Sequence, residues 1–559
     1  MEDISVQQAA APLPGSTVPD LPMEDISVQQ AAAPLPSSTV PDLPIEEISV
    51  QQGESEINPV PRDGDSTEPQ DSAPPATSRP LLFGNYRYSH EIILFSFFFY
   101  TYFPFKNIIL MFAILILGGV LSIKESLKLF GVYQKMEFTK TTNYCSFYDN
   151  KLNSFVACLY LATTVSILPS FVCSKLFGRR VVVCCGFGLV LLGSILLTIK
   201  NLPTLFIGRI ICGFGVGCIL QVLPIYISES TPAEYADFLD SKFDYGFNFG
   251  GFVVASTVNL LVAMNKLGWR WSFGLTGVLA LASLMLSTTT PESPHYFIEM
   301  KDIERAKIAF KKTRGRLIVA EFDNLVAESE DVYSSLFQPF RLQYMPSLFI
   351  ACVREVFMQM TGMFAINFFT PIFLTSIGVS ASTSFISSMG VGYTYFIMAI
   401  LGGMLVDRYK RRVILRSSAS VMIFALFMMF GLLRMSNYDV MYFEVDVAVA
   451  VSMAMFFYVC GYAVISGPRG WFSVPLPRRA KGMGSALTMT ISMLFVSLMA
   501  YISAPVVCVC KEYIVLIFGL YAVLMETFIC LLVPETRDIS EEEMNVKAWG
   551  QHRIWKKCI

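Results

Sequence analysis

Apolar runs of about 20 residues alternate with short polar breaks from Ile92 almost to the end of the chain. Each run is long enough to cross the roughly 30 Å hydrocarbon core of a bilayer as an α-helix. The pattern therefore predicts an all-α membrane protein. Its twelve predicted spans are centred near residues 108, 163, 190, 214, 252, 280, 360, 395, 423, 460, 493 and 523.

The longest polar break covers residues 292–343 and separates the sixth span from the seventh. It contains KDIERAKIAFKKTRGR, whose charge spacing indicates short helices on an aqueous surface. Two six-helix halves around a charged loop are typical of transporters built from repeats. We therefore predict halves at 89–291 and 344–534, a cytoplasmic helical loop at 292–343, and a C-terminal tail at 535–559.

The first 88 residues have a different composition. MEDISVQQAAAPLPGSTVPDLP is followed at once by a copy that differs only in having Ser37 where the first has Gly15, and a third, weaker copy begins IEEISVQQ. This Pro-rich, acidic segment has too few apolar side chains to offset the entropy of ordering. It is predicted to be a disordered tail, either a recent duplication or a docking platform.

Composition excludes several classes of function. The 559-residue chain is 54% hydrophobic and 15% charged, with a net charge of −2, and it lacks a basic patch for nucleic acid. Most of its 13 cysteines lie in apolar runs, and its three histidines are scattered. No phosphate loop, HExxH or GxSxG motif occurs. We expect no metal, no cofactor and no enzymatic activity.

Lysine and arginine residues indicate the orientation. They cluster after the second span, in the central loop, after the eighth span and after the tenth, whereas the breaks after the third and seventh spans hold only Lys200. Positively charged loops remain in the cytoplasm. Both termini are therefore predicted to be cytoplasmic, although the loop after the first span is an external exception rich in lysine.

Short motifs recur at equivalent places in the two halves. KLFGRR follows the second span and VDRYKRR the eighth, while PIYISES, PESPHYF and VPETRD supply carboxylates near the same side. Arginines at a helix end can bridge carboxylates on neighbouring helices and so close one face of a two-state transporter. The predicted members of this cytoplasmic gate are Arg179, Arg180, Glu229, Glu292, Asp407, Arg411, Arg412 and Glu535.

These motifs, together with TNYCSFYDNKL, GRIICGFGVGCILQVLPIYISE, QMTGMFAINFFTPIF, GPRGW and SMLF, make residues 90–548 resemble the sugar porter family of the major facilitator superfamily. The plant sugar transport proteins, which are monosaccharide/proton symporters, are the most similar group. The resemblance implies a twelve-helix fold in the plasma membrane. It also implies a hexose site near mid-membrane, with two halves that rock around it.

A hexose needs groups that both donate and accept hydrogen bonds, and an aromatic face for its ring. Gln221, Gln359 and Trp471 match family positions of this kind, although Gln359 could instead bond a neighbouring helix and Trp471 could serve in packing. Side-chain amides of the family are replaced at Phe364, Tyr245, Tyr395 and Ser492, so the predicted sugar site has fewer hydrogen-bonding groups than the family's site. The predicted substrate-binding residues are Gln221, Gln359, Trp471, Phe364, Tyr245 and Asn367.

In the symporter group, the arginine at Arg209 faces an aspartate on the first span, and protonation of that aspartate couples proton entry to sugar binding. Here the aspartate's place falls at Ala113, and no carboxylate lies between Glu91 and Glu125. Three interpretations remain open. Arg209 reaches water at a membrane boundary, it pairs with Glu526 or Asp244, or it stays near the sugar path and coupling is lost.

The resemblance also implies an external disulfide that ties the loop after the first span to the outer end of the eleventh. Cys145 and Cys508 match its two positions, with Cys510 as a rival partner and two free thiols as the alternative.

The sequence as a whole predicts monosaccharide transport by alternating access, with protons as a possible second substrate. A non-transporting sugar sensor, and a porter of another small solute, are the alternatives. The sequence carries no signal for oligomeric state.

Overall fold

The computed structural model is all-helical within the residues that it describes. Nine of the described helices are long and apolar enough to cross a membrane, and Met389–Leu405 is a shorter apolar helix. All described residues belong to the unit Asn85–Ile559. They are 149–230, 254, 257–258, 260–262, 269–314, 322–323, 325–327, 344–366, 381–435, 445–466, 478–535, 549–550, 552 and 555–557.

The helices follow the predicted spans, and every predicted centre except those near 108 and 252 falls in a described helix. The earlier ones are α4 (Asn150–Phe177), α5 (Arg179–Leu197), α6 (Leu202–Ser230), α9 (Trp269–Thr289), α10 (Pro294–Glu299) and α11 (Ile303–Arg314). The later ones are α13 (Met345–Met360), α15 (Ala381–Arg408), α16 (Arg411–Met435), α17 (Val445–Ser466), α18 (Arg478–Cys510), α19 (Tyr513–Leu532) and η7 (Trp555–Lys557).

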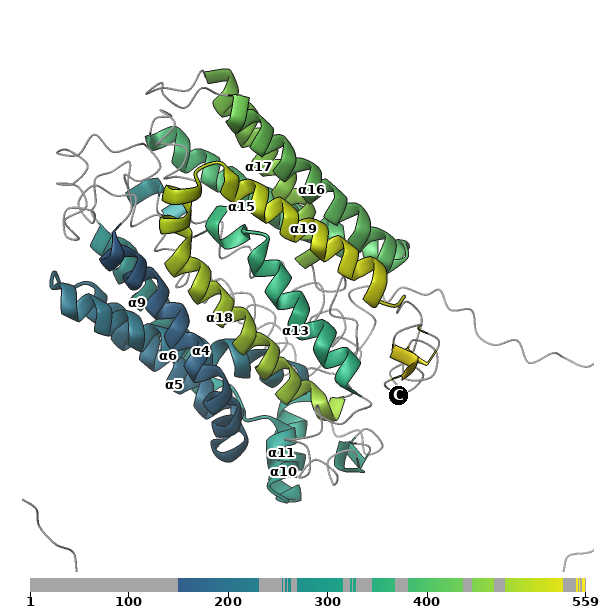
Figure 1. Ribbon diagram of the computed structural model, residues 1–559. Helices are drawn as coiled ribbons and strands as arrows, with labels where there is room; N and C mark the ends of the chain where they lie inside the picture. The colour runs from purple at the N-terminus through teal and green to yellow at the C-terminus, as the bar shows by residue number, and fades with distance from the viewer. Residues whose placement is uncertain are drawn as a thin grey trace, which may run out of the picture. The chain divides into compact units, whose positions relative to one another are not determined.

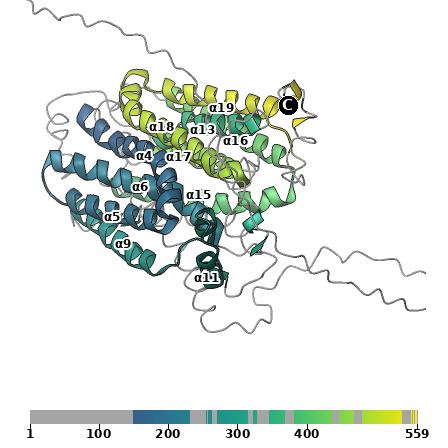
Figure 2. The ribbon, with the colours of Figure 1, turned by 90° about the horizontal axis from the view of Figure 1, so that it is seen from below.

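Helices α4, α5, α6 and α9 pack around a first hydrophobic core, and Figures 1 and 2 both show them grouped. Glycines let the backbones approach closely, as is common between membrane helices. A Cβ at Gly213 would overlap the carbonyl of Leu159 on α4. The Thr163 hydroxyl of α4 links the two helices, because it donates to the carbonyl of Leu159 on its own helix, at 2.9 Å, and to that of Gly213 on α6, at 3.1 Å.

A second hydrophobic core lies among α13, α15, α16, α17 and α19. Its centre is built from small and flexible side chains, such as Met422, Ala425 and Ala522, which are fully buried. Small residues at these positions allow close helix packing in an apolar environment. Trp549 and Trp555, from the C-terminal segment, belong to the same core.

Helix α18 joins the two cores. It packs on α4 and on α13, and Figure 1 shows it running between them. Val496 and Ala500, one turn apart, belong to the first core, whereas Met499 belongs to the second. Ser497 donates to the carbonyl of Ala157 on α4 at 3.2 Å. The two faces of α18 therefore pack against different cores.

Helix α13 is interrupted directly after Met360. Gly362 has φ +88°, a left-handed conformation that favours glycine, and helical turns resume at residues 363–366. The buried Tyr458 hydroxyl of α17 donates to the carbonyl of Thr361 at 3.0 Å. This bond satisfies a carbonyl that the interrupted helix leaves free. Interrupted membrane helices commonly form binding sites in transporters.

Candidate functional site

Two amide side chains point at one face of α18. The amide nitrogen of Gln221, on α6, lies 3.4 Å from the carbonyl oxygen of Gly482 and 3.5 Å from the hydroxyl of Ser485. That of Gln359, on α13, lies 3.4 Å from the hydroxyl of Ser492. Ser485 and Ser492 are two helical turns apart, about 10 Å along the axis, so they share a face.

These contacts are at the long end of hydrogen-bond geometry and are weak. Each amide also has a carbonyl oxygen that can accept a hydrogen bond, and Gln359 has a second N–H that can donate one. We call Gln221, Gln359, Ser485 and Ser492 the amide face. Because its groups both donate and accept, the amide face can bind a ligand rich in hydroxyl groups.

An aromatic pair joins α4 to the segment that follows the interruption of α13. Phe364, two residues beyond the interruption of α13, stacks edge-on against Tyr160 of α4, with ring centroids 5.3 Å apart. Phe364 packs against both hydrophobic cores. It therefore contributes an apolar contact between the two groups of helices, at the place where the family has an asparagine.

The remaining predicted substrate-binding residues, Trp471, Tyr245 and Asn367, lie outside the described residues. Tyr395, where the family has another amide, is buried on α15 and hydrogen-bonds the hydroxyl of Ser466.

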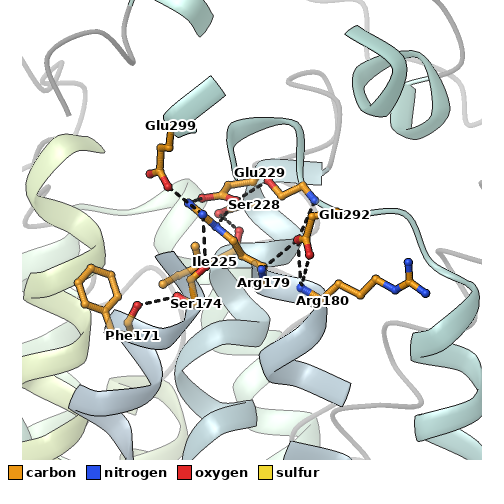
Figure 3. A network of polar contacts seen from close by, with 10 residues as sticks. Phe171, Ser174, Arg179, Arg180, Ile225, Ser228, Glu229, Glu292 and Glu299 are labelled. Carbon is orange, nitrogen blue, oxygen red and sulfur yellow. Dashed lines mark hydrogen bonds and ion pairs between the residues drawn. The ribbon is translucent and has the colours of Figure 1, made fainter. Parts of the chain in front are cut away.

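Arg179, the first residue of α5, lies in a second polar site, shown in Figure 3. Its Nε lies 3.0 Å from Oε2 of Glu229, and its Nη2 donates to Oε1 of the same carboxylate at 3.1 Å. Its Nη1 lies 2.8 Å from Oε2 of Glu299, on α10. The guanidinium is almost completely buried. A buried cation is stable only when such partners compensate for lost hydration.

Glu292 holds the same helix end through the backbone. Its carboxylate accepts the N–H groups of Arg179, at 2.9 Å, of Arg180, at 3.0 Å, and of Ser293, at 3.0 Å. A carboxylate at a helix N-terminus satisfies free N–H groups and complements the helix dipole. Burial nevertheless raises the pKa of Glu292, against these bonds and the nearby Arg179, which favour the charged form.

We call Arg179, Arg180, Glu229, Glu292, Ser293 and Glu299 the Arg179 cluster. The sequence motifs indicated four of its members but missed Glu299 and Ser293. Ser293 donates to Glu229 at 2.5 Å, and its place inside PESP could have suggested a role. Nothing in the sequence around Glu299 distinguishes it from an ordinary surface carboxylate.

The later helices repeat part of this arrangement. Glu535, just after α19, accepts the backbone N–H of Arg412 at 3.2 Å, near the start of α16. The Arg412 side chain donates to the carbonyl of Cys530. Arg411 begins α16, and the side chain of Asp407 lies outside the described residues. A carboxylate thus holds the first turn of α16 as Glu292 holds that of α5.

Arg209 is fully buried on α6 and has no carboxylate partner in the part of the chain that the structure describes. Its guanidinium lies over the ring of Phe155, 5.2 Å from the centroid, and its Nε and Nη2 lack an acceptor. Contact with water is therefore wrong, since the residue is 1% exposed. Pairing with Glu526 is also wrong, because Nε and Nη2 of Arg209 have no acceptor and Glu526 is not among the charged groups that act on Arg209; its carboxylate instead accepts the Ser420 hydroxyl at 2.9 Å. Ala113 and Asp244 lie outside the described residues.

Cys508, near the end of α18, is disulfide-bonded, whereas Cys510 is a free thiol. Cys510 is thus not the disulfide partner of Cys145. The pairing of Cys145 with Cys508 stays a prediction, because Cys145 lies outside the described residues.

A family profile described as "Sugar (and other) transporter" matches residues 103–548. The chain belongs to the sugar transporter family. Within this family it is similar to sugar transport protein 4 of Arabidopsis thaliana, with 30% identity over 463 residues, 79% of this chain and 88% of that protein. It is also 30% identical to hexose carrier protein HEX6 of Ricinus communis, over 79% of this chain and 89% of that protein.

Among solved structures, this sugar transporter family member is similar to the partially occluded, inward-open form of the xylose transporter XylE from E. coli. The TM-score is 0.65 at 20% identity, over 80% of this chain and all of that one. XylE is described as a major facilitator superfamily symporter. This structural similarity confirms the predicted fold. The described helices are consistent with the twelve transmembrane helices predicted for this chain. The chain is a transporter-family protein and not an enzyme.

Proposed function

We propose that the chain carries a monosaccharide across the membrane by alternating access. The observation that carries this proposal is the amide face, where Gln221 and Gln359 approach α18 from helices of the two different cores. A sugar bound there contacts both groups of helices at once. The names of the relatives, a sugar transport protein and a hexose carrier, support a hexose as the substrate.

Sugar hydroxyls replace the weak bonds that Gln221 and Gln359 make to α18. Because those bonds are long, breaking them costs little free energy. The shorter hydrogen bonds to a sugar then favour binding. Phe364 and Tyr160 supply the apolar surface on which a sugar ring packs. The interruption at Gly362 lets the end of α13 move separately from its start, which opens or closes the site.

The Arg179 cluster holds the transporter closed at one face, and the bond between Glu535 and Arg412 does the same in the second group of helices. The lysine and arginine counts support a cytoplasmic position for this face, and we propose the plasma membrane as the location. Breaking the cluster separates α5 from α6 and α10, and that movement exposes the sugar site to the cytoplasm.

We further propose that transport is passive and not driven by protons. The structure gives Arg209 no carboxylate partner among the described residues, and the sequence has Ala113 where the symporters resembled have an aspartate. Without a carboxylate that gains and loses a proton beside Arg209, proton entry cannot be linked to sugar binding there.

Uptake of labelled glucose tests both proposals. The full chain is expressed in cells that lack their own hexose carriers, and uptake is measured at acidic and neutral external pH, with and without a protonophore. We expect saturable uptake that is indifferent to both. Absence of uptake, with surface expression confirmed, would overturn the hexose proposal. Uptake that collapses with the protonophore would overturn passive transport and direct mutagenesis to Asp244.

A further inference from the structure

Arg209 is a cation enclosed by neutral groups. Phe155 lies against one side of its guanidinium, and Cys158, Tyr160 and Cys212 are the ionisable side chains around it in the described chain. Thiols and phenols carry no charge near neutral pH in apolar surroundings. Arginine keeps its proton in proteins. The positive charge therefore persists inside the helix bundle without a compensating negative charge from these neighbours.

The two nitrogen atoms without an acceptor are Nε and Nη2. Their N–H groups lie on the same edge of the planar guanidinium and point in nearly the same direction. This is the edge that receives a carboxylate side-on, with one oxygen on each nitrogen. Among the described residues, Arg209 therefore has an unsatisfied pair of hydrogen-bond donors with a defined geometry.

The same chain shows what this edge binds when it is filled. In Arg179, Nε lies 3.0 Å from one oxygen of Glu229, and Nη2 lies 3.1 Å from the other. Both arginines are buried, 2% exposed at Arg179 and 1% at Arg209. They differ in that Arg179 has a protein carboxylate on its Nε–Nη2 edge, whereas Arg209 has none among the described residues.

An unpaired charge in the interior is costly because it loses its hydration without gaining a counter-charge. Contact with an aromatic ring compensates for only part of that loss. Within a membrane the cost is larger, and charged residues there pair with one another or with a ligand. The burial of Arg209 therefore favours the entry of an anion.

We propose that Arg209 binds a small carboxylate anion, of the size of formate or acetate, at a buried site beside Phe155, in the neighbourhood of Cys158, Tyr160 and Cys212. The planar anion accepts both free N–H groups side-on, at the edge where Glu229 forms its ion pair with Arg179. It compensates the charge that no described protein carboxylate compensates. The site uses none of the amide-face residues, although Tyr160 belongs to both proposed sites, and the proposal does not depend on which solute the chain carries.

The first test measures thermal unfolding of the purified full chain in detergent, titrated with sodium formate or with sodium chloride at equal ionic strength. We expect formate to raise the melting temperature saturably, by about 2–4 °C more than chloride, because a ligand that binds only the folded state stabilises it. Equal effects of the two salts would overturn a carboxylate-specific site.

Three variants locate the effect. Arg209→Met should lose the formate-specific shift, and it should fold because it removes an uncompensated buried charge. Ala113→Asp should melt higher without formate and should no longer respond to it. The surface variant Arg305→Met, on α11, is the matched control and should keep the full shift, since Arg305 is 72% exposed. A shift retained in Arg209→Met would overturn the proposal.

Direct binding provides a measurement that does not depend on how the variants fold. Equilibrium dialysis of the wild-type chain with radiolabelled formate should show one saturable site per chain, displaced by acetate and not by chloride. Binding without saturation, or without displacement by acetate, would overturn the site.

Discussion

Arg179 and Glu229 join the first residue of α5 to the last turn of α6, with 3.0 Å between Nε and Oε2. Only 3% of the Arg179 side chain and 14% of the Glu229 side chain is exposed. Arg179 also contacts Glu299 on α10, so one guanidinium connects three helices. The ion pair can therefore hold a closed face only while both carboxylates remain in place.

Glu229→Gln should destabilise the folded chain strongly. Arg179 would then be buried with one carboxylate where it has two, and breaking a buried ion pair typically costs about 3–5 kcal/mol. The melting temperature of the purified protein should fall by several degrees. If the Arg179 cluster closes the transporter, the ratio of inward to outward transport rates should change as well.

The matched control is Glu304→Gln, on α11. Glu304 is 86% exposed, and its carboxylate lies 3.9 Å from the amine of Lys307. An exposed pair of this kind contributes about 0–1 kcal/mol, so the variant should melt as the wild type does. Equal stability of the Glu229 and Glu304 variants would show that the Arg179 cluster does not hold these helices together.

Gln359→Ala should weaken sugar binding more than it slows transport. The lost hydrogen bond to a ligand typically corresponds to about 1–3 kcal/mol, which predicts a KM higher by about tenfold or more and a nearly unchanged maximal rate. Uptake at several glucose concentrations separates the two parameters. Thr527→Ala, which removes an exposed hydroxyl on α19, is the control. An unchanged KM in Gln359→Ala would place the sugar elsewhere.

The sequence predicts the helices of this protein well because each one must be apolar over its whole length to cross a bilayer. It also indicates the Arg179 cluster, because paired arginines at one helix end and a carboxylate at another are visible as short motifs. Arg179 and Glu229 lie 50 residues apart in sequence. The recurrence of these motifs at equivalent places in the two halves suggested that they meet.

Other features could not be predicted because they depend on packing between distant segments. Glu299 has the local sequence of a surface residue and becomes an ion-pair partner only where α10 reaches Arg179. The surroundings of Arg209 could not be predicted either: contact with water and pairing with Glu526 proved wrong, while pairing with Asp244 stays a prediction. A sequence shows that a partner is missing at Ala113, but not whether another helix replaces it.

Gly362→Ala should destabilise the interruption in α13. A side chain at φ +88° is strained by about 1–3 kcal/mol, and its Cβ would overlap the ring of Phe518 on α19. The melting temperature should fall. Phe518→Ala is itself destabilising because it empties part of the core, so the cost of Gly362→Ala is measured in that background as well, where it should be smaller by the part that comes from the overlap. Gly431→Ala, at an open helical position on α16, should be neutral or stabilising. Equal melting temperatures for Gly362→Ala and Gly431→Ala would mean that the interruption is not rigid.

Glu292 should make stability depend on pH. Its pKa is raised in the folded chain, so the folded state holds this proton to a higher pH than the unfolded state does. The stability that the protonated group contributes is complete below the unfolded pKa and is lost as the pH rises through the folded pKa. The melting temperature of the wild type should therefore fall, relative to that of Glu292→Gln, as the pH rises from about 4 to neutral. A difference that changes in the opposite direction would show that the backbone N–H bonds outweigh burial.

Trp555 should anchor the C-terminal segment to the helix bundle. Its indole N–H donates to the carbonyl of Leu532, at the end of α19, at 2.9 Å, and its ring packs edge-on against Phe349 of α13, with centroids 5.9 Å apart. Trp555→Phe keeps an aromatic ring but loses the bond, at a typical cost of about 1 kcal/mol. Trp555→Ala loses both contacts. Hydrogen exchange of the C-terminal peptide should accelerate modestly in the first variant and strongly in the second, and not at all in Trp271→Phe, whose ring is 64% exposed. Equal exchange in all three variants would mean that Trp555 does not hold the segment in place.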